Sequence, residues 1–344
     1  MSDGSPPLVD EAALEDYLDE HLGPSGALSV ERHRAGHSNE TFFVSRGDSR
    51  YVLRRPPRGA FLPTAHDVGR EYRVLHALDS TTVRSPRTVL MCGETDVIGA
   101  PFYLMERVDG VVIRADLPRT YGESSRGEIG DELVDALAEL HAVDIDEAGL
   151  ADFGRREGYL GRQLKRWAGQ LELTLPMTRP VPDLEAIAEW LLANQPASPP
   201  TTLVHGDYKL DNVMFATEPP ARLLTILDWE MSTLGDPLAD LGWMVSFWLD
   251  EREGGDDVFV DLNRVTRHPG FRPRAALVKR YEDKTGRDTS GLDWYRVLAT
   301  WKLAILLEGS YARHLAGATD DPFFARMEHG VPALARRGLE IAHS

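Results

Sequence analysis

The sequence predicts an α+β protein with two lobes, a small β-rich N-terminal lobe followed by a larger, mainly α-helical C-terminal lobe. Up to about Val108, short stretches of alternating apolar and polar residues dominate, and a single helical pattern interrupts them. Beyond that point, apolar residues recur mostly at helical spacing. The length of 344 residues suits two lobes of medium size. We therefore expect an N-terminal lobe at 1–107 and a C-terminal lobe at 108–344.

In the N-terminal lobe, alternation predicts strands, and a change of period predicts one internal helix. Val68, Tyr72 and Leu75 recur at i, i+4 and i+7, which is the spacing of one face of an amphipathic helix. An earlier helix ends at Gly23 and Pro24, residue types that terminate helices. The expected helices are Leu8–His21 and Val68–Leu78, and the expected strands are Ala27–Arg34, Glu40–Arg46, Arg50–Arg54, Thr88–Cys92 and Pro101–Val108.

The C-terminal lobe combines one short β-rich segment with several helices. Leu133, Leu137 and Leu140 form a single helical stripe, whereas Thr202–Leu227 has the apolar runs of buried strands. The other helices that apolar spacing predicts are Tyr159–Leu173, Leu184–Asn194, Pro237–Asp250, Arg274–Thr285, Trp294–Leu315 and Phe323–Ile341.

Composition and charge exclude several classes of partner. The formal net charge of -17 produces a field that repels nucleic acid and anionic membranes, so we expect neither as a main ligand. Cys92 is the single cysteine, so no disulfide framework and no thiolate zinc site can form within the chain. The first residues lack the basic and apolar regions of a secretory signal, and no apolar run approaches the ~18 residues that span a bilayer. We expect a cytoplasmic protein, and its oligomeric state stays open.

One segment, Leu203–Phe215, carries the spacing H-x-D-x-K-x-x-N, which is found in kinase catalytic loops. In this pattern Asp207 can orient or deprotonate an acceptor hydroxyl, Lys209 can balance charge on a transferring phosphoryl group, and Asn212 can hold a metal ion. Apolar residues on both sides predict short buried strands that fix the loop. The alternative is a polar hairpin with capping residues, which four simultaneous matches disfavour.

A second motif follows, where the apolar run Leu224–Leu227 ends abruptly at Asp228. A carboxylate at the end of a buried strand can face phosphates and bind Mg²⁺, which prefers oxygen ligands. Alone, this pattern would fit an aspartate that makes a turn at a strand end. After the preceding loop, a magnesium ligand is the stronger interpretation.

Together, these motifs resemble the aminoglycoside phosphotransferase family. The resemblance rests on HGDYKLDN, on ILDWE and on the GDPLADL that follows, and it extends from about Leu28 to the C-terminal helices. That family shares the protein-kinase-like two-lobed fold and includes choline kinase and other small-molecule kinases. Residues 50–57 (RYVLRRPP) and 103–110 (YLMERVDG) resemble a branch related to the kinase-like domain of certain acyl-CoA dehydrogenase family proteins.

The resemblance implies how the N-terminal lobe would bind a nucleotide. A cation on the third strand, usually lysine, contacts the α- and β-phosphates, and here Arg54 occupies that position. Alternation places Arg54 on the face of Val52, and helical spacing places Glu71 on the inward face of its helix, so we expect the two to pair. The alternatives are an exposed arginine on an edge strand and a partly exposed glutamate.

Two further nucleotide contacts follow from the resemblance. The turn that holds Ser38 and Asn39 would cover the phosphates, although it lacks the G-x-G-x-x-G pattern and an ordinary β-turn stays an alternative. The hinge between the lobes would hold adenine through the Glu106 carbonyl and the Val108 N–H.

Other positions have structural interpretations. In the family, the acid that matches Asp240 braces the catalytic loop, and Asp236 before Pro237 is expected to cap a helix. Trp243 and Phe247 are expected in the core, with a share in an acceptor pocket left open.

These observations predict an ATP- and Mg²⁺-dependent phosphotransferase that moves the γ-phosphoryl group to a hydroxyl of a small molecule. The acceptor stays open among aminoglycoside-like, hydroxyacyl and other metabolites. A nucleotide-binding pseudokinase without transfer activity is the alternative, and Arg54 in place of lysine is its only support. A protein kinase is disfavoured, because the stretch from Asp228 to Asp240 is too short to dock a peptide.

Overall fold

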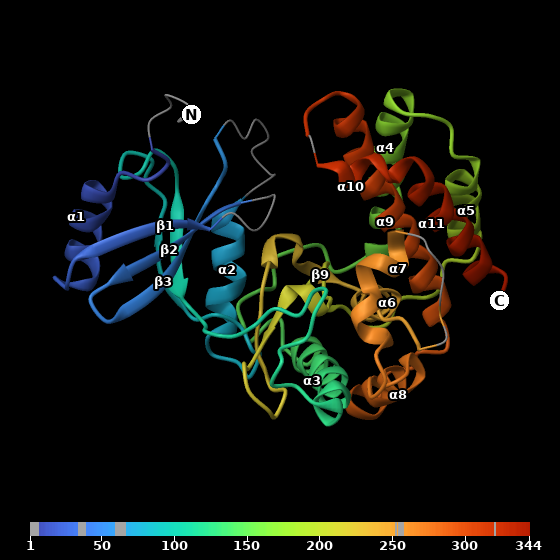
Figure 1. Cartoon of the computed structure of the whole chain (residues 1–344), viewed down its shortest axis with the longest axis horizontal. Coiled ribbons are helices and arrows are strands. Elements are labelled where there is room, and N and C mark those ends of the chain that lie inside the picture. Colours follow the sequence, from blue (N-terminus) through green and yellow to red (C-terminus); the bar gives the residue numbers. More distant parts are fainter. Residues whose placement is uncertain (1–6, 34–38, 59–66, 252, 254–257, 320) are drawn as a thin grey trace. The chain divides into compact units, whose positions relative to one another are not determined.

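The computed structural model describes residues 7–33, 39–58, 67–251, 253, 258–319 and 321–344. The chain forms two compact units (Figure 1). Unit 1 consists of Met1–Asp109 together with Thr225–Glu230, and unit 2 consists of Gly110–Leu224 and Met231–Ser344. No helix in the described part of the chain is long and apolar enough to cross a membrane.

An antiparallel sheet forms the centre of unit 1. Within the described residues its five strands lie in the order β1-β2-β3-β5-β4. The β2–β3 hairpin pairs Phe42 with Leu53, and β3 pairs Arg54 with Tyr103 on β5. The strands are β1 (Leu28–His33), β2 (Glu40–Arg46), β3 (Ser49–Arg55), β4 (Thr88–Cys92) and β5 (Phe102–Glu106).

Two helices cover the two faces of this sheet (Figure 1). Helix α1 (Glu11–Leu22) begins after Asp10, whose carboxylate accepts a hydrogen bond from the Ala13 N–H at 3.2 Å. Helix α2 (Val68–Leu78) begins in the same way after Asp67. Because a capping side chain satisfies an otherwise unpaired helical N–H, both aspartates fix where their helices start. Asp10 explains why the first helix begins at Glu11 and not at Leu8.

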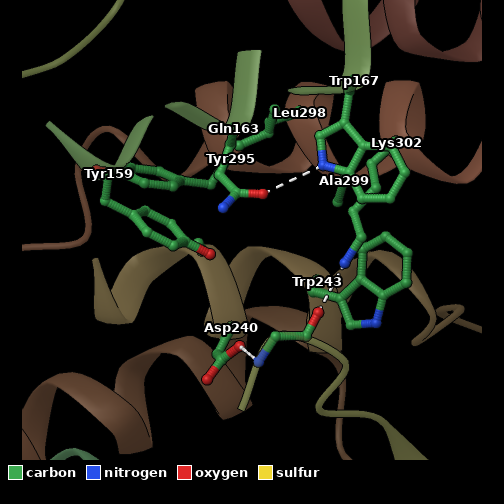
Figure 2. Close-up of a pocket in the computed structure, with 11 residues that line it drawn as sticks. Tyr159, Gln163, Trp167, Asp240, Trp243, Tyr295, Leu298, Ala299 and Lys302 are labelled. Carbon is green, nitrogen blue, oxygen red and sulfur yellow. Dashed lines mark hydrogen bonds between the residues drawn. The ribbon is translucent and has the colours of Figure 1, made fainter. Parts of the chain in front are cut away.

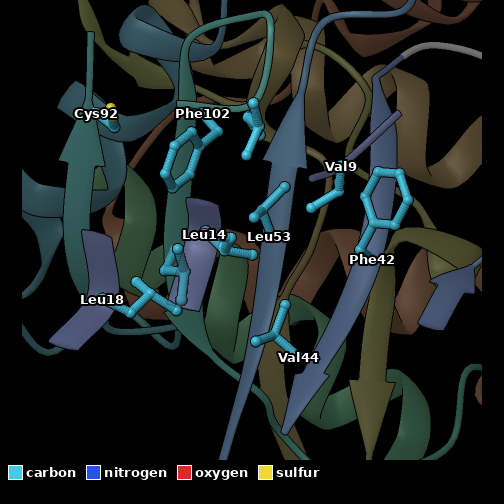
Figure 3. Close-up of a cluster of buried hydrophobic side chains, with 10 residues drawn as sticks. Val9, Leu14, Leu18, Phe42, Val44, Leu53, Cys92 and Phe102 are labelled. Atoms are coloured by element: carbon cyan, nitrogen blue, oxygen red, sulfur yellow. The ribbon is translucent and has the colours of Figure 1, made fainter. Parts of the chain in front are cut away.

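The face toward α1 carries an apolar core (Figure 3). Leu14 and Leu18 of α1 are fully buried against side chains from four strands. Alternation along β3 sends Leu53 into this core and Arg54 to the opposite face, toward α2. The buried members of the cluster are Val9, Leu14, Leu18, Phe42, Val44, Leu53, Cys92, Ile98, Phe102 and Leu104.

Unit 2 is mainly helical and includes short strand pairs. Strand β6 (Thr202–Val204) pairs with β9 (Thr233–Gly235), and β7 (Val213–Phe215) pairs with β8 (Leu223–Ile226), whose last residues belong to unit 1. The helices of unit 2 are α3 (Glu123–His141), α4 (Tyr159–Thr174), α5 (Pro182–Ala193), α6 (Pro237–Ser246), α7 (Val258–Asn263), α8 (Arg274–Thr285), α9 (Leu292–Leu315), α10 (Pro322–Ala325) and α11 (Met327–Ala342).

Helix α9 is the central element of unit 2, because α4, α5, α6 and α11 all pack against it. Gly242 on α6 permits the close contact between α6 and α9, since a Cβ there would lie 2.5 Å from the Cβ of Tyr295. The buried Trp301 adds a long-range hydrogen bond from its Nε1 to the Leu184 carbonyl at 2.9 Å. These contacts fix the part of α9 that carries Lys302, whose Nζ donates to the Gly206 carbonyl.

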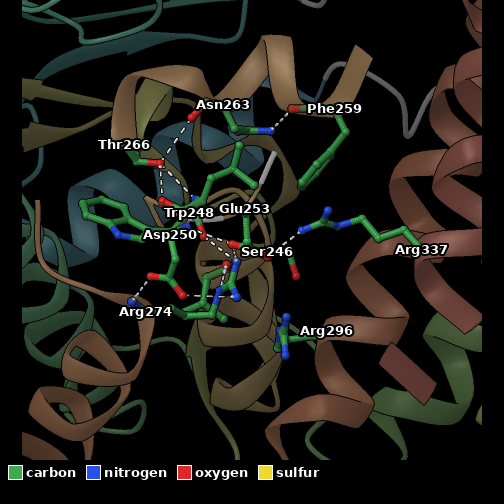
Figure 4. A network of polar contacts seen from close by, with 12 residues as sticks. Ser246, Trp248, Asp250, Glu253, Phe259, Asn263, Thr266, Arg274, Arg296 and Arg337 are labelled. Atoms are coloured by element: carbon green, nitrogen blue, oxygen red, sulfur yellow. Dashed lines mark hydrogen bonds and ion pairs between the residues drawn. The ribbon is translucent and has the colours of Figure 1, made fainter. Parts of the chain in front are cut away.

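The predicted helix Pro237–Asp250 ends four residues early, at Ser246. The Leu249 N–H donates to the Thr266 hydroxyl and not to a carbonyl of the preceding turn. The Asp250 carboxylate accepts from the Arg274 N–H at the start of α8, in a network that also includes Glu253 (Figure 4). Because side chains far along the sequence take over these backbone groups, local periodicity could not locate this helix end.

The C-terminal prediction also needs correction. The expected helix Phe323–Ile341 is two helices, α10 and α11, separated at Arg326. Asp321 caps α10 by accepting from the Phe323 N–H. Helix α7 was not predicted at all.

The core of unit 1 leads to a first prediction. Replacing Leu14 with alanine should lower the free energy of unfolding by about 2–5 kcal/mol, because it leaves a cavity in a fully buried cluster. Leu22→Ala on the same helix is the matched control, since Leu22 is 38% exposed and should change stability by less than about 0.5 kcal/mol. Urea unfolding followed by circular dichroism measures both. Equal losses for the two variants would contradict this account of the core.

Candidate functional site

Arg54 and Glu71 meet on the face of the sheet that α2 covers. Arg54 Nη2 lies 3.1 Å from Glu71 Oε1, as the sequence predicted, and Glu71 is only 3% exposed. Burial raises the pKa of Glu71, and Arg54 opposes that rise. Arg54 Nε is buried without a hydrogen-bond partner among the described residues. A guanidinium with an unused donor can therefore bind an additional anion such as phosphate.

Asp228 has an unusual backbone. Its φ is 63°, in the left-handed region, and it is the one described residue other than glycine with positive φ. Such conformations cost about 1–3 kcal/mol and cluster at functional sites. The adjacent Trp229 stabilises the turn, because its Nε1 donates to the Ile226 carbonyl at 3.0 Å. The turn at the end of β8 thus sets the direction of the Asp228 side chain.

The Asp228 carboxylate also fits a metal ligand. Its Oδ1 is buried and makes no hydrogen bond within the described chain, and it lies 3.7 Å from Arg54 Nη2. A buried carboxylate oxygen without a donor is costly unless a cation satisfies it. Carboxylate oxygens are the ligands that Mg²⁺ prefers. Arg54 supplies part of the required positive charge, and a bound cation would supply the rest.

Tyr103 is a residue of this cluster that the sequence did not reveal. It is fully buried on β5, directly opposite Arg54 in the sheet register. Burial beside the Glu71 carboxylate raises the pKa of Tyr103 well above its usual value, so its hydroxyl stays protonated. Sequence reasoning missed Tyr103 because its place depends on the pairing of β3 with β5, which local alternation does not specify.

Asn39 belongs to the same cluster. It is 8% exposed, and its Nδ2 donates to Glu71 Oε2 at 3.3 Å. Asn39 therefore helps to hold the Glu71 carboxylate in place. Its expected part in covering the phosphates stays a prediction. Ser38 lies outside the described residues.

The expected hinge residues lie at the end of β5. Glu106 ends this strand and is exposed, and its N–H donates to the Arg87 carbonyl at 2.8 Å. Val108 is half-buried just beyond the strand, and its N–H makes no hydrogen bond within the described chain. That N–H is therefore available to a ligand, as the adenine prediction requires.

In unit 2, the Asp240 carboxylate holds the loop that begins at His205. Asp240 Oδ2 accepts from the His205 N–H at 2.6 Å, and Oδ1 accepts from the Gly206 N–H at 2.8 Å. Gly206 has a φ of 83°, and a Cβ there would lie 2.6 Å from the Met231 carbonyl oxygen. Glycine is thus required at this turn. The structure gives Asp240 the bracing contacts that the sequence prediction assigned to it.

Two donors hold the Asp207 carboxylate from both sides. Trp243 Nε1 donates to Asp207 Oδ1 at 2.7 Å, and Asn212 Nδ2 donates to Asp207 Oδ2 at 2.7 Å. Burial raises the pKa of Asp207, while Lys209 and Lys302 oppose that rise. A carboxylate with a raised pKa is a better proton acceptor than one in water. The geometry suits a group that accepts or orients a hydroxyl proton.

Lys209 lies close to two carboxylates. Its Nζ is 3.1 Å from Asp211 Oδ2 and 4.0 Å from Asp207 Oδ2. The nearer partner is therefore Asp211, and a role in balancing phosphoryl charge stays a prediction.

Asn212 has the properties of a metal ligand, because its side-chain amide oxygen is not used in a hydrogen bond to Asp207. Both hydrogen bonds of its side chain, to the Asp207 carbonyl and carboxylate, use Nδ2 and leave the amide oxygen for a cation. The described residues contain no group of three or more His, Cys, Asp or Glu side chains arranged to hold a metal. Mg²⁺ in nucleotide enzymes is held by one or two protein carboxylates and completed by phosphates and water, so such a group is not required.

Lys302 and Trp243 are two contacts of the catalytic loop that the sequence did not assign (Figure 2). Lys302 Nζ donates to the Gly206 carbonyl at 2.6 Å and lies 3.9 Å from the centre of the Trp243 ring. Trp243 was expected in the core, and Lys302 interrupts the apolar stripe of α9. A lysine inside such a stripe is a signal that could have identified Lys302.

The chain matches a family model described as the phosphotransferase enzyme family over residues 29–295. Among curated relatives, acyl-CoA dehydrogenase family member 11 from Gallus gallus is 37% identical over 350 residues. The Homo sapiens protein of the same name is 33% identical over 344 residues. Each match covers 97% of this chain and 43% of the relative, so the chain spans less than half the length of these relatives.

Solved structures agree with this assignment. A Ralstonia eutropha protein, assigned as an aminoglycoside phosphotransferase, is 33% identical with a TM-score of 0.81, covering 97% of this chain and 98% of that one. Macrolide 2'-phosphotransferase type I has a TM-score of 0.61 at 19% identity, covering 94% and 99%, and shares the fold. The predicted fold class and the predicted family are both confirmed. The chain belongs to the phosphotransferase enzyme family.

Proposed function

We propose that this protein is an ATP- and Mg²⁺-dependent phosphotransferase that moves the γ-phosphoryl group to a hydroxyl of a small molecule. The single observation that carries the proposal is the Asp207 carboxylate, which Trp243 and Asn212 hold at 2.7 Å each. Hydrogen bonds hold both oxygens of this carboxylate, and its pKa is raised, so it accepts a proton more readily. Both properties suit the general base of a phosphoryl transfer. Family membership supports the same reaction class.

In the proposed reaction, Asp207 accepts or orients the proton of the acceptor hydroxyl. The hydroxyl oxygen forms a new bond to the γ-phosphorus, the bond from that phosphorus to the β–γ bridging oxygen breaks, and ADP leaves. Arg54 would bind phosphate oxygens through donors that Glu71 does not use. Asp228 and Asn212 would each offer an oxygen atom to magnesium, which offsets phosphate charge when bound. Positioning and electrostatics then supply most of the rate acceleration.

The acceptor class is the open part of this proposal. The names of the curated relatives favour hydroxylated acyl metabolites, and the name of the Ralstonia protein favours aminoglycosides. A screen of pooled hydroxyl metabolites with ATP, Mg²⁺ and mass detection tests both classes, with Asp207→Ala protein as the blank. A mass increase of one phosphoryl group that appears only with the wild-type protein identifies the acceptor.

A nucleotide-binding pseudokinase is the second candidate, because Arg54 replaces the usual lysine. It predicts Mg²⁺-dependent nucleotide binding without transfer to any hydroxyl. Asp207, Asn212 and Asp228, all present in the chain, argue against it. Phosphoryl transfer that is present in the wild type and lost in Asp207→Ala would exclude the pseudokinase.

Asp207→Asn should lower turnover by ~10²–10⁴-fold, because the amide cannot accept the hydroxyl proton. Nucleotide affinity should stay within about twofold of the wild type, since the substitution changes no contact proposed for the nucleotide. The matched control is Asp146→Asn, an exposed carboxylate of unit 2 that pairs with Arg156. Steady-state phosphorylation of the identified acceptor measures turnover. Full turnover by Asp207→Asn would overturn the mechanism.

Asp228→Ala should abolish the enhancement of ATP binding by Mg²⁺, because it removes the proposed carboxylate ligand. Asp228→Asn should do the same with less loss of stability, since asparagine tolerates positive φ better than alanine. Isothermal titration with ATP, with and without Mg²⁺, measures the effect. The control is Asp48→Ala in the exposed β2–β3 turn. If both Asp228 variants keep the full enhancement, Asp228 does not bind the metal.

A further inference from the structure

Lys302 is a buried ammonium group without a carboxylate partner. It lies on α9, is 9% exposed, and forms no ion pair within 4.0 Å among the described residues. Its contacts are the Gly206 carbonyl at 2.6 Å and the aromatic rings of Trp243 and Trp167, at 3.9 Å and 5.6 Å from Nζ to the ring centres. Lysines are almost never fully buried unless they are paired, so this one calls for an explanation.

The contacts of Lys302 converge on Asp207. Gly206, whose carbonyl accepts from Lys302, directly precedes Asp207 in the chain. Trp243, whose ring lies under the ammonium, donates its Nε1–H to Asp207 Oδ1. A cation over the face of an indole draws electron density from the ring, which makes the N–H a stronger donor. Lys302 therefore contacts both the backbone that precedes this carboxylate and the indole that donates to it. Figure 2 shows Lys302 beside the Trp243 ring.

We propose that Lys302 is a positioning residue, whose protonated form fixes the Asp207 carboxylate through the Gly206 carbonyl and the Trp243 indole. The effect on turnover rests on the proposed phosphotransferase function. The effect on the Trp243 indole does not, because it follows from the geometry of unit 2 alone.

The surroundings of Lys302 determine at which pH this support is lost. Burial lowers the pKa of Lys302 to about 8; the carboxylates of Asp207 and Asp240 oppose that change, and Arg166 and Lys209 add to it. As the pH rises through about 8, the ammonium loses its proton and the indole loses the cation on its face. A cavity of about 30 Å³ beside Lys302 gives room for water to take up that proton. Two tyrosines, Tyr159 and Tyr295, line this cavity, and their raised pKa values keep both hydroxyls neutral near pH 8.

The first test measures the Trp243 indole directly. Protein with ¹⁵N-labelled tryptophan gives an indole N–H signal for Trp243, which Trp243→Phe assigns by its loss. In the wild type we expect this signal to shift with a midpoint near pH 8. Lys302→Met should remove that transition, and Lys302→Arg should move it above pH 10, because arginine stays protonated. A Trp243 titration in Lys302→Met identical to that of the wild type would overturn the proposal.

The second test measures turnover with water as the acceptor, as Mg²⁺-dependent ATP hydrolysis without added substrate. We expect the wild-type kcat to fall above pH 8 and Lys302→Met to lose ~10–100-fold at pH 7, with the KM for ATP nearly unchanged. Lys302→Arg should recover much of the loss and remove the alkaline limb. A kcat of Lys302→Met equal to that of the wild type would refute the positioning role.

A matched control separates this role from a structural one. Trp301→Phe removes a buried indole N–H on the same helix, whose partner is the Leu184 carbonyl and not Asp207. It should lower the melting temperature and leave the Trp243 titration unchanged. Lys302→Met should not lower the melting temperature at pH 7, because burial of the ammonium already opposes folding. If the wild type shows no ATP turnover, the proposed function fails, and the indole titration still decides the role of Lys302.

Discussion

Unit 2 depends on the hydrogen bonds that the Asp240 carboxylate accepts. Its two oxygens accept hydrogen bonds from the N–H groups of His205 and Gly206, so it determines the path of the backbone immediately before Asp207. A buried charge is tolerated only when hydrogen bonds replace the lost water. The bonds that Asp240 accepts supply this compensation and lower its pKa despite burial. Without Asp240, two backbone donors would be left buried and unsatisfied.

The third partner of Asp240 is His141, at the end of α3. Burial lowers the pKa of His141, so the imidazole is neutral near pH 7. A carboxylate can only accept, which places the imidazole proton on Nε2, 3.3 Å from Asp240 Oδ2. Nδ1 then accepts from the Tyr281 hydroxyl at 2.7 Å. A continuous series of hydrogen bonds thus links α8, α3 and α6 to the loop at His205, and the donors on both sides converge on the Asp240 carboxylate.

Local patterns were enough for most of the elements and for the motif residues, because those depend on neighbours in sequence, but they missed α7, the end of α6 and the break between α10 and α11. Alternation located β2 and β4 to the residue, and helical spacing correctly turned Glu71 inward. Tyr103 and Lys302 were beyond such reasoning, since their surroundings come from strand pairing and from packing of α6, α9 and the catalytic loop. The roles of Asp207, Asn212 and Asp228 in catalysis and metal binding stay predictions.

Arg54 shows why the departure from lysine does not by itself indicate an inactive protein. A lysine has one nitrogen, which must serve both the helix glutamate and the phosphates. Arg54 Nη2 forms ion pairs with Glu71 and Asp228, and neither Nη2 nor Nε makes a hydrogen bond among the described residues. A buried donor without an acceptor is costly unless a ligand satisfies it. The guanidinium can therefore keep its pairing with Glu71 while it binds an anion, which favours a working phosphate site over a vestigial one.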